Sequence, residues 1–530
     1  MAKNFLSRRA NGKLFNENIT EGVHPLSTLQ RIGIIDIGSN SIRLVIYEQT
    51  GNLAHRIIDE SKHSARLSQR IGQDGILPLK DIFAIIDTLS YFKKLCDIYR
   101  TARIRTVATA AIRNAANSQQ IVQLLEEKTK LNIDVLSGTE EARLGFLGMT
   151  NTIDVEDGFL VDIGGGSTEI TLFQNRKIIN SISFPFGSVN TIVQHNKEGH
   201  INGSQVSAAQ QMIENALLEQ PWIRNHPGLP LIGLGGTFRS LSRIDQKSRK
   251  YSLPLTHNYV ISGNDASHLL EKMQSMSINQ LKKVEGLTKD RIDIIIPGMV
   301  ILTTLFKHIQ AEHFLISGSG IRDGIYYETL LPTQPFLENV LEHSVRNLLY
   351  LHPSVSVNHL HQVNRLVLKL YEDVFKPLLT EERSSIYLYV SSLLYRTGVT
   401  VNYYNFDKHT FYVMTHSRID GLSHREILLC ALIASYKSRN RTRQMALIHK
   451  DIISEPDIEI VVKLGTLLQL AIALDRSETQ PILRLEAKAL KKVCCLHLQL
   501  QHNPSVERRE VEALSKDFHK VWGFHLKIMD

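Results

Sequence analysis

Cysteine is scarce in this 530-residue chain, which contains only Cys96, Cys430, Cys494 and Cys495. These four have neither the CxxC spacing of a zinc site nor the pattern of a disulfide framework. We therefore expect a protein of the reducing cytoplasm, without structural zinc or disulfides. The adjacent Cys494 and Cys495 are predicted to lie on a strand.

Long apolar segments are also lacking. The longest, Ile292 to Leu305, is interrupted by Asp293, Pro297 and Gly298, and it is shorter than the roughly 20 residues that cross a membrane. The N-terminus has no apolar segment followed by a small-residue cleavage site, which argues against secretion. We predict no membrane partner, and we interpret residues 1–30 as an N-terminal arm.

The composition is that of an ordinary globular protein, with 43% hydrophobic and 22% charged residues. Its length exceeds the roughly 250–300 residues at which one core usually stops growing, so several domains are expected. Lys and Arg number 61 against 53 Asp and Glu, a formal net charge of +8. This excess would favour encounters with polyanions, although solubility alone explains it equally well.

A strand, a glycine turn and a second strand occur twice in the sequence. The first copy places Asp36, Gly38 and Ser39-Asn40-Ser41 between two apolar stretches, and the second places Asp162 to Glu169 in the same way. Both turns lack the Gly-Lys-Ser/Thr of a Walker loop, and a strand rather than a helix follows the glycines. Their backbone N–H groups and hydroxyls are suited to phosphate oxygens.

Carboxylates recur at equivalent places in these turns. Asp36 and Asp162 end the first strand of each copy, and Glu169 closes the second turn. Carboxylates repel a polyanion unless a cation lies between them, so we predict a bound divalent metal, Mg²⁺, near Asp36, Asp162 and Glu169. The competing interpretation is that each acidic residue merely caps a glycine-rich hairpin.

The rest of the chain divides into an α/β part and a helical part. Leu79 to Tyr99 and Ser118 to Lys130 have helical periodicity, Ile104 to Ala108 is strand-like, and further glycine clusters at 231–237 and 316–324 could complete a cleft. Beyond about residue 333, amphipathic helical stretches dominate. The stretch Lys437 to Arg443 is expected to be an exposed connector, and a strand is expected at Ala489 to Leu500.

Taken together, the motifs resemble the exopolyphosphatase and guanosine pentaphosphate phosphohydrolase (Ppx/GppA) family. The segments that carry the resemblance are 36–41, 109–113, 137–144 (Ser-Gly-Thr-Glu-Glu-Ala-Arg-Leu), 162–169, 235–237 and 317–324. The implied fold is α/β, with two actin-like (ribonuclease H-like) subdomains, an α-helical HD-like domain and a small α+β C-terminal domain. The predicted boundaries are 31–151, 152–332, 333–440 and 441–530.

The resemblance also implies roles for individual residues. Glu141, the second glutamate of its motif, matches the catalytic base, and Arg113 matches an arginine of the catalytic site. Asp162, Glu169 and Asp36 match positions near the metal. The positions implied for phosphate binding are Ser39, Asn40, Ser41, Arg43, Gly164, Gly165, Ser167, Gly236 and Arg291.

The helical region resembles an HD-hydrolase domain that has lost its active centre. His361 stands where the first histidine is expected, but Tyr395-Arg396 replaces the His-Asp pair. His361, His409 and His424 therefore provide no convincing metal set, and a second phosphohydrolase centre is not expected.

The function predicted from these residues is release of orthophosphate from the end of inorganic polyphosphate, with Glu141 as general base. The alternatives are a guanosine pentaphosphate 5'-phosphohydrolase and a non-catalytic polyphosphate or nucleotide sensor. The basic residues of Lys437 to Arg443 favour a long polyanion as substrate. We expect a homodimer and no specific nucleic-acid partner.

Overall fold

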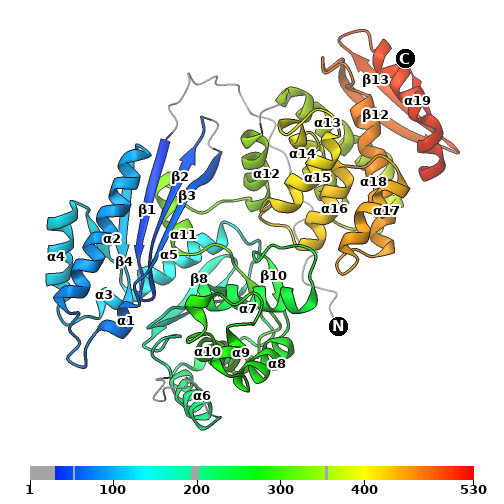
Figure 1. The fold of residues 1–530 in the computed structure, drawn as a ribbon. Coiled ribbons are helices and arrows are strands. Elements are labelled where there is room, and N and C mark those ends of the chain that lie inside the picture. The colour runs from blue at the N-terminus through cyan, green and yellow to red at the C-terminus, as the bar shows by residue number, and fades with distance from the viewer. Residues whose placement is uncertain (1–29, 52–53, 193–200, 202, 353–355, 530) are drawn as a thin grey trace.

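The computed structural model describes residues 30–51, 54–192, 201, 203–352 and 356–529. The predicted N-terminal arm lies outside the described residues, except for Gln30. Figure 1 shows two α/β units side by side, a bundle of helices beside them, and a small sheet with one helix at the far end.

The first α/β unit contains a five-stranded sheet in the order β3-β2-β1-β4-β5. β1 to β3 are antiparallel neighbours, and β4 and β5 run parallel to β1. The apolar run around Ile34 and Ile35 is fully buried, as expected of a strand covered on both faces. The elements are β1 (Gln30–Ile37), β2 (Ser41–Gln49), β3 (His55–Ser64), α1 (Leu67–Arg70), α2 (Leu79–Ile98), β4 (Arg103–Ala108), α3 (Ala110–Arg113), α4 (Ser118–Thr129), β5 (Ile133–Val135) and α5 (Gly138–Thr150).

The second unit repeats this order as β8-β7-β6-β9-β11 and adds β10, antiparallel, at the end. This duplicated topology is the actin-like fold, which confirms the predicted fold class and the two predicted strand-turn-strand copies. The elements are β6 (Gly158–Ile163), β7 (Thr168–Gln174), β8 (Lys177–Phe184), α6 (Gly203–Leu218), η1 (Pro221–Arg224), β9 (Leu231–Leu234), α7 (Gly235–Arg249), β10 (Tyr259–Ile261), α8 (Gly263–Gln274), α9 (Ile278–Leu281), η2 (Lys289–Arg291), α10 (Ile295–Ile309) and β11 (Phe314–Ile316).

Helix α11 (Ile321–Leu330) follows the second sheet but packs against the first, where Ile325 and Tyr326 join the core around Ile34. It crosses α5 with the two backbones in contact. A β-carbon on Gly324 would lie 2.0 Å from the carbonyl oxygen of Leu144. No side chain fits there, so glycine is required for this crossing.

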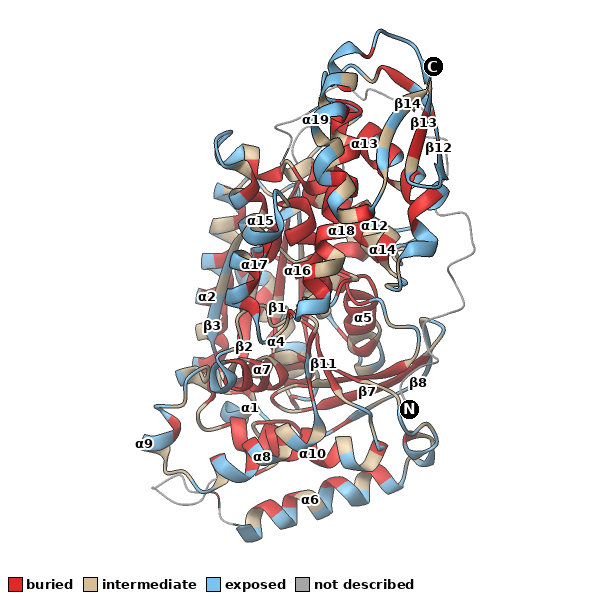
Figure 2. Cartoon of the chain, turned by 90° about the vertical axis from the view of Figure 1, so that its right-hand side faces the viewer, coloured by how far each residue is buried: buried red, intermediate tan, exposed pale blue. Residues whose placement is uncertain are grey.

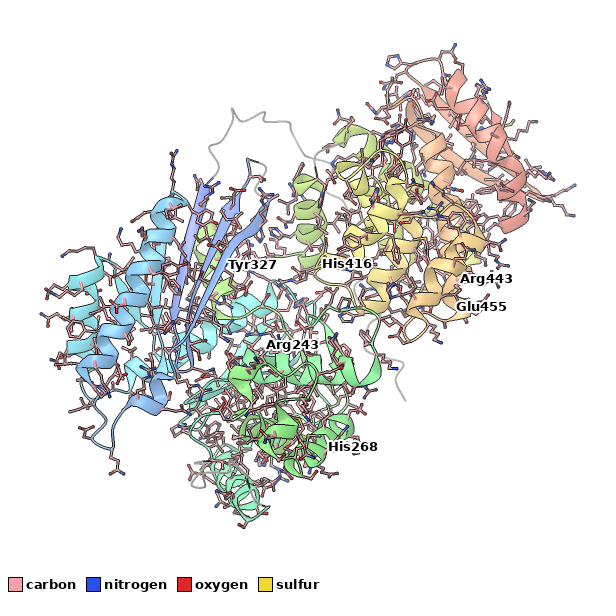
Figure 3. All side chains as sticks on the ribbon, in the orientation of Figure 1. Arg243, His268, Tyr327, His416, Arg443 and Glu455 are labelled. Atoms are coloured by element: carbon pink, nitrogen blue, oxygen red, sulfur yellow. The ribbon has the colours of Figure 1, made fainter. Side chains whose placement is uncertain are left out.

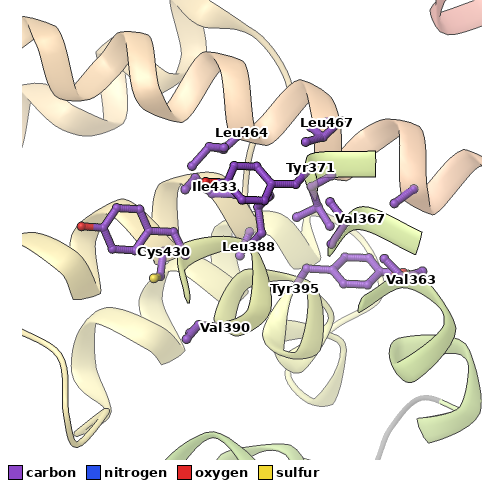
Figure 4. Close-up of a cluster of buried hydrophobic side chains, with 14 of the residues drawn as sticks. Val363, Val367, Tyr371, Leu388, Val390, Tyr395, Cys430, Ile433, Leu464 and Leu467 are labelled. Atoms are coloured by element: carbon purple, nitrogen blue, oxygen red, sulfur yellow. The ribbon is translucent and has the colours of Figure 1, made fainter. Parts of the chain in front are cut away.

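The helical region is built around one extensive core. Figure 4 shows Tyr371, Leu388, Tyr395 and Cys430 within it, and Figure 2 shows the buried faces of its central helices. The elements are α12 (Val340–Leu351), α13 (Val357–Leu370), η3 (Tyr371–Phe375), η4 (Lys376–Leu378), α14 (Ser384–Leu394), η5 (Thr397–Thr400), α15 (Phe406–His416), α16 (His424–Ala434), α17 (Arg439–Ala446), η6 (Leu447–His449) and α18 (Glu455–Ala473).

The C-terminal part is a three-stranded sheet covered by one helix: β12 (Ile482–Leu490), β13 (Val493–Leu500), α19 (Ser505–Trp522) and β14 (His525–Met529). The single strand expected at Ala489 to Leu500 is instead the end of a hairpin, which turns at Lys491 and Lys492. Cys494 and Cys495 lie on β13, as predicted. Trp522 packs against Phe375, so this part shares its core with the helices.

The basic stretch expected to be an exposed connector forms most of α17, and its cations are paired. Lys437 and Arg441 both bind Asp407, and Arg439 binds Glu459. Arg443 donates from Nε to Oε1 of Glu455 at 3.0 Å, and Figure 3 shows these two side chains together. Because these cations are already paired with carboxylates, the stretch Lys437 to Arg443 no longer favours a long polyanion as substrate.

Within the described residues, no helix is both long enough and apolar enough to cross a membrane.

Candidate functional site

The two glycine turns face each other between the α/β units. Each is closed by a backbone hydrogen bond, from Gly38 N to Ser41 O at 3.2 Å and from Gly164 N to Ser167 O at 2.9 Å. A β-carbon on Gly165 would lie 3.1 Å from Cβ of Ser39. The two copies therefore form opposite walls of one cleft.

The cleft encloses about 150 Å³, and it gathers most of the residues predicted from sequence. The predicted residues that line it are Asp36, Ser39, Asn40, Ser41, Arg43, Glu141, Asp162, Gly164, Gly165, Ser167, Gly236 and Arg291. Both further glycine clusters contribute as well, through Gly235 and Gly236 and through Gly318 and Gly320. Arg113 and Glu169 do not line the cleft itself: Arg113 donates to Glu141, and Glu169 lies opposite Asp162 on the neighbouring strand.

Two cross-strand pairs place the charged groups of the repeats. Asp36 lies opposite Arg43 on β2, and Asp162 lies opposite Glu169 on β7. Equivalent positions of the two copies therefore carry a cation, Arg43, in the first unit and a second carboxylate, Glu169, in the second. Burial raises the pKa of Asp36, and burial together with the nearby Asp36 raises the pKa of Asp162 to about 6.

Glu141 is distinguished from its neighbour Glu140 by position. Ser137 caps α5, with its Oγ accepting from Glu140 N at 3.1 Å. Glu141 turns into the cleft, with 16% of its side chain exposed, whereas the side chain of Glu140 is 41% exposed and pairs with Arg143. Only Glu141 is placed to act on a group bound in the cleft.

Arg113 orients the carboxylate of Glu141. Its Nη1 donates to Oε2 of Glu141 at 2.9 Å and to the carbonyl oxygen of Leu136 at 2.8 Å. Burial nevertheless raises the pKa of Glu141 well above the ordinary range, and Arg113 only partly offsets this. A carboxylate with a pKa near neutrality is suited to accept a proton.

Behind Glu141 lies a second, smaller space of about 10 Å³, which Asp162 and Glu169 also line. This is close to the volume of one water molecule. Glu169 accepts from Ser183 Oγ at 2.8 Å, and burial and the nearby Glu141 raise its pKa. Three carboxylates from both α/β units therefore meet at this space, rather than each capping an isolated hairpin.

Four arginines reach the cleft, and two of them were not predicted from the sequence. Arg239 on α7 and Arg322 on α11 line it together with Arg43 and Arg291. Arg322 donates to Oε1 of Glu60 at 3.1 Å. Burial, together with the neighbouring arginines, lowers the pKa of Arg239 to about 9 and that of Arg291 to about 10. Such crowding of cations is relieved by a bound anion.

The described part of the cleft also contains a buried side chain without a hydrogen-bond partner. Among the described residues, neither side-chain atom of Asn40 has a hydrogen-bond partner, although both are buried. The Nη2 atom of Arg291 lies where a β-carbon on Gly236 would be, only 1.6 Å away. The phosphate-binding role of Gly236 stays a prediction, and its lack of a side chain makes room for the guanidinium of Arg291.

Two ion pairs connect the α/β units at the edge of the cleft. Lys62 on β3 pairs with Asp290, and Arg66 Nη1 lies 2.7 Å from Oδ2 of Asp293. Both acceptors flank Arg291 in sequence. The pairs hold the second unit, and Arg291 with it, against the first.

The carboxylates suit a hard cation such as Mg²⁺ by the chemistry of their donor set. Among the described residues, no three His, Cys, Asp or Glu side chains converge closely enough to surround a metal ion by themselves. Mg²⁺ in phosphate sites is commonly held by one or two carboxylates, with water and phosphate oxygens completing the shell. Asp162 and Glu169 can supply these two carboxylates.

In the helical region the buried, hydrogen-bonded histidine of α13 is His359 rather than His361. His361 is exposed, whereas His359, two positions earlier and on the opposite face of α13, is buried. His359 Nδ1 donates to Oδ2 of Asp475 at 2.7 Å, and its Nε2 accepts from the Tyr395 hydroxyl at 2.5 Å. His361 therefore takes no part in this buried group, in which the hydroxyl of Tyr395 bonds His359.

The fold and the cleft define an α/β protein of two actin-like subdomains with an anion-suited, carboxylate-lined site between them. Two sequence models of one protein family match this chain. The sequence model of the Ppx/GppA phosphatase family matches residues 44–333, and that of Ppx/GppA phosphatase domain III matches residues 340–514. The chain belongs to the Ppx/GppA phosphatase family.

Solved structures agree with this assignment. The crystal structure of the Aquifex aeolicus Ppx/GppA family member is 25% identical, with a TM-score of 0.51, covering 58% of this chain and 100% of that one. An exopolyphosphatase from Cytophaga hutchinsonii is 21% identical, with a TM-score of 0.53 and the same coverage. The second similarity supports the fold alone.

Proposed function

We propose that this phosphatase is an exopolyphosphatase, which removes the terminal phosphate of inorganic polyphosphate. The observation that carries the proposal is the composition of the cleft. Four arginines line it, and none of the described residues that line it is aromatic. Repeated guanidinium groups suit a chain of phosphates, whereas a guanine base gains most from an aromatic or apolar surface.

The binding step uses both walls of the cleft. The turns at Gly38–Ser41 and Gly164–Ser167 offer backbone N–H groups and hydroxyls to the terminal phosphate. Arg43 and Arg291 approach from opposite units, so both can hold one phosphate chain. The unpartnered amide of Asn40 gains a phosphate oxygen as acceptor.

The chemical step centres on Glu141. Its carboxylate accepts a proton from the attacking water, or orients that water in line with the terminal phosphorus. Arg113 fixes the carboxylate's position through the 2.9 Å hydrogen bond. The shortened polyphosphate leaves on the opposite side of the phosphorus, where arginines offset its charge.

We further propose that Mg²⁺ is held by Asp162 and Glu169, with Asp36 orienting its water or the neighbouring turn. When bound, the ion neutralises charge that develops on the phosphate oxygens. The raised pKa of Asp162 fits this role, because a carboxylate that is costly to ionise alone is stabilised by a cation.

A substrate panel tests the proposal. Purified protein with Mg²⁺ is given long polyphosphate, short polyphosphate, guanosine pentaphosphate and ATP, and released orthophosphate is measured. We expect polyphosphate to give the highest kcat/KM. Faster release from guanosine pentaphosphate would make the protein a guanosine pentaphosphate 5'-phosphohydrolase. Binding without release from any substrate would indicate a non-catalytic sensor.

The homodimer and the cytoplasmic location stay predictions. Light scattering of the purified chain would measure the first, and cell fractionation would measure the second.

A further inference from the structure

His257 lies outside the cleft but contacts one of its turns. It precedes β10, is only 7% exposed, and its Nδ1 accepts a hydrogen bond from Gly318 N at 3.0 Å. Gly318 and Gly320 line the cleft, and α11 begins immediately after them. The imidazole therefore holds the turn that delivers Arg322.

The other ring nitrogen fixes which tautomer is present. Because Nδ1 accepts from an N–H group, the ring proton is on Nε2. That atom lies 3.1 Å from the carbonyl oxygen of Thr152 and 3.2 Å from Oδ1 of Asp420. Both are acceptors, so this tautomer is the one that the surroundings require. Burial also lowers the pKa of His257, which keeps the ring neutral.

Asp420 belongs to the helical region, in the loop between α15 and α16. Its backbone N–H donates to Ser344 Oγ at 2.9 Å, and its Oδ1 accepts from Arg418 Nε at 2.6 Å. Burial opposes ionisation of Asp420, but the adjacent Arg418 lowers the pKa to about 2. A permanently charged, firmly held carboxylate thus faces His257.

These contacts form a continuous connection from the helical region to the cleft. It runs from Asp420 to His257, from His257 to Gly318, and along the turn to Gly320, whose N–H donates to Oδ2 of Asp323 at 2.8 Å. We propose that His257 is a positioning residue through which Asp420 of the helical region fixes the Gly318–Gly320 turn at the cleft. This role rests on the proposed function.

Two substitutions separate the functions of the two ring nitrogens. His257→Asn places an amide oxygen near Nδ1 and keeps an acceptor for Gly318. His257→Gln places its amide near Nε2, so it keeps the Asp420 side and loses that acceptor. We expect His257→Gln to raise KM for polyphosphate by about five- to tenfold, the equivalent of one buried hydrogen bond. His257→Asn loses only the contact to Asp420, so it should raise KM less than His257→Gln does, and by about as much as Asp420→Ala.

Asp420→Ala tests the connection to the helical region. It should raise KM in the wild-type background but add nothing to His257→Gln, because the link is already broken there. Tyr251→Phe is the matched control: it removes a 2.9 Å hydrogen bond to His424 Nδ1 at the same junction, without a contact to the turn. It should leave KM unchanged.

The proposal is overturned if His257→Asn and His257→Gln raise KM equally, if the effects of His257→Gln and Asp420→Ala multiply, or if Tyr251→Phe raises KM as much. Hydrogen exchange of residues 317–320 in the substrate-free protein gives an independent readout. It should be faster in His257→Gln than in His257→Asn. If the wild-type protein releases no phosphate, the proposed function fails, and this exchange difference still decides the positioning role.

Discussion

Glu141 is the residue whose chemistry is easiest to isolate. Glu141→Gln keeps the side chain's size and its hydrogen bond to Arg113 but cannot accept a proton. We expect kcat to fall by about 10²–10⁴-fold, the usual contribution of a general base, while polyphosphate binding persists. Steady-state kinetics combined with a direct binding measurement would show this.

The neighbouring glutamate is a matched control for that experiment. Glu140→Gln changes an adjacent position of the same helix, but Glu140 pairs with Arg143 and faces away from the cleft. Its turnover should stay close to wild type. Equal losses in the two variants would remove Glu141 from the role of base.

Gly236 gives a second prediction at the residue scale. In Gly236→Ala the added methyl would lie 1.6 Å from Nη2 of Arg291, so the guanidinium must leave its place. We expect KM for polyphosphate to rise by about tenfold or more, as for loss of a charge-assisted hydrogen bond. Gly203→Ala is the control, because a β-carbon at Gly203 meets no atom within 4 Å. An unchanged KM in Gly236→Ala would show that Arg291 does not contact the substrate.

At the scale of helices, the hydrogen-bonded group of His359, Asp475 and Tyr395 joins α13 to the ends of α14 and α18. His359→Ala removes the hydrogen bond to Oδ2 of the buried Asp475, whose Oδ1 still accepts from Gln480 N, so we expect the free energy of unfolding to fall by about 1–3 kcal/mol. Denaturant titration would measure this. His361→Ala, two positions away and exposed, should change the stability little. If the two variants are equally stable, this group does not hold the helices together.

The elements predicted best were those with local signals. Glycine-rich turns between apolar strands identified both copies of the repeat, and helical periodicity identified α2 and α4 within a residue or two at each end. The hairpin of β12 and β13 was missed because its turn, Lys491-Lys492, contains no Gly, Asn, Asp or Pro, although Lys491 adopts a positive φ of 53°.

Other features were invisible because their causes are distant in the sequence. The carboxylate that pairs with Lys437 and Arg441 is Asp407 on α15, which lies 30 and 34 residues earlier in the chain. Arg239 reaches the cleft only because α7 starts at Gly235 and turns once before presenting it. No local motif marks either relationship, since both depend on how whole elements pack.

For the whole molecule, the buried carboxylates predict how stability depends on pH. Burial raises the pKa of Asp162 from its ordinary value of 3.8 to about 6 in the folded chain. Folding therefore favours the protonated form of Asp162. Its contribution to the free energy of unfolding is fully present below about pH 4 and is lost as the pH rises through about 6. With a chelator present, the melting temperature should fall across this window.

Two comparisons check the origin of this effect. Asp162→Asn should show a smaller decline than wild type over the same window. Added Mg²⁺ should reduce the decline in the wild-type protein, because a cation stabilises the ionised carboxylates. Identical pH profiles for wild type and Asp162→Asn would assign the decline to other groups.

The backbone contact between α5 and α11 constrains how the molecule can move. Sliding between packed helices requires side chains that can repack, but here Gly324 lies directly against the Leu144 carbonyl and Gly148 against that of Gly320. The two helices must therefore travel as one rigid body, and domain opening has to occur as a hinge rotation elsewhere. Glu141 is carried by α5 and Arg322 by α11. Their separation is consequently preserved in any rearrangement of the two α/β units, so the base and this arginine approach a substrate together.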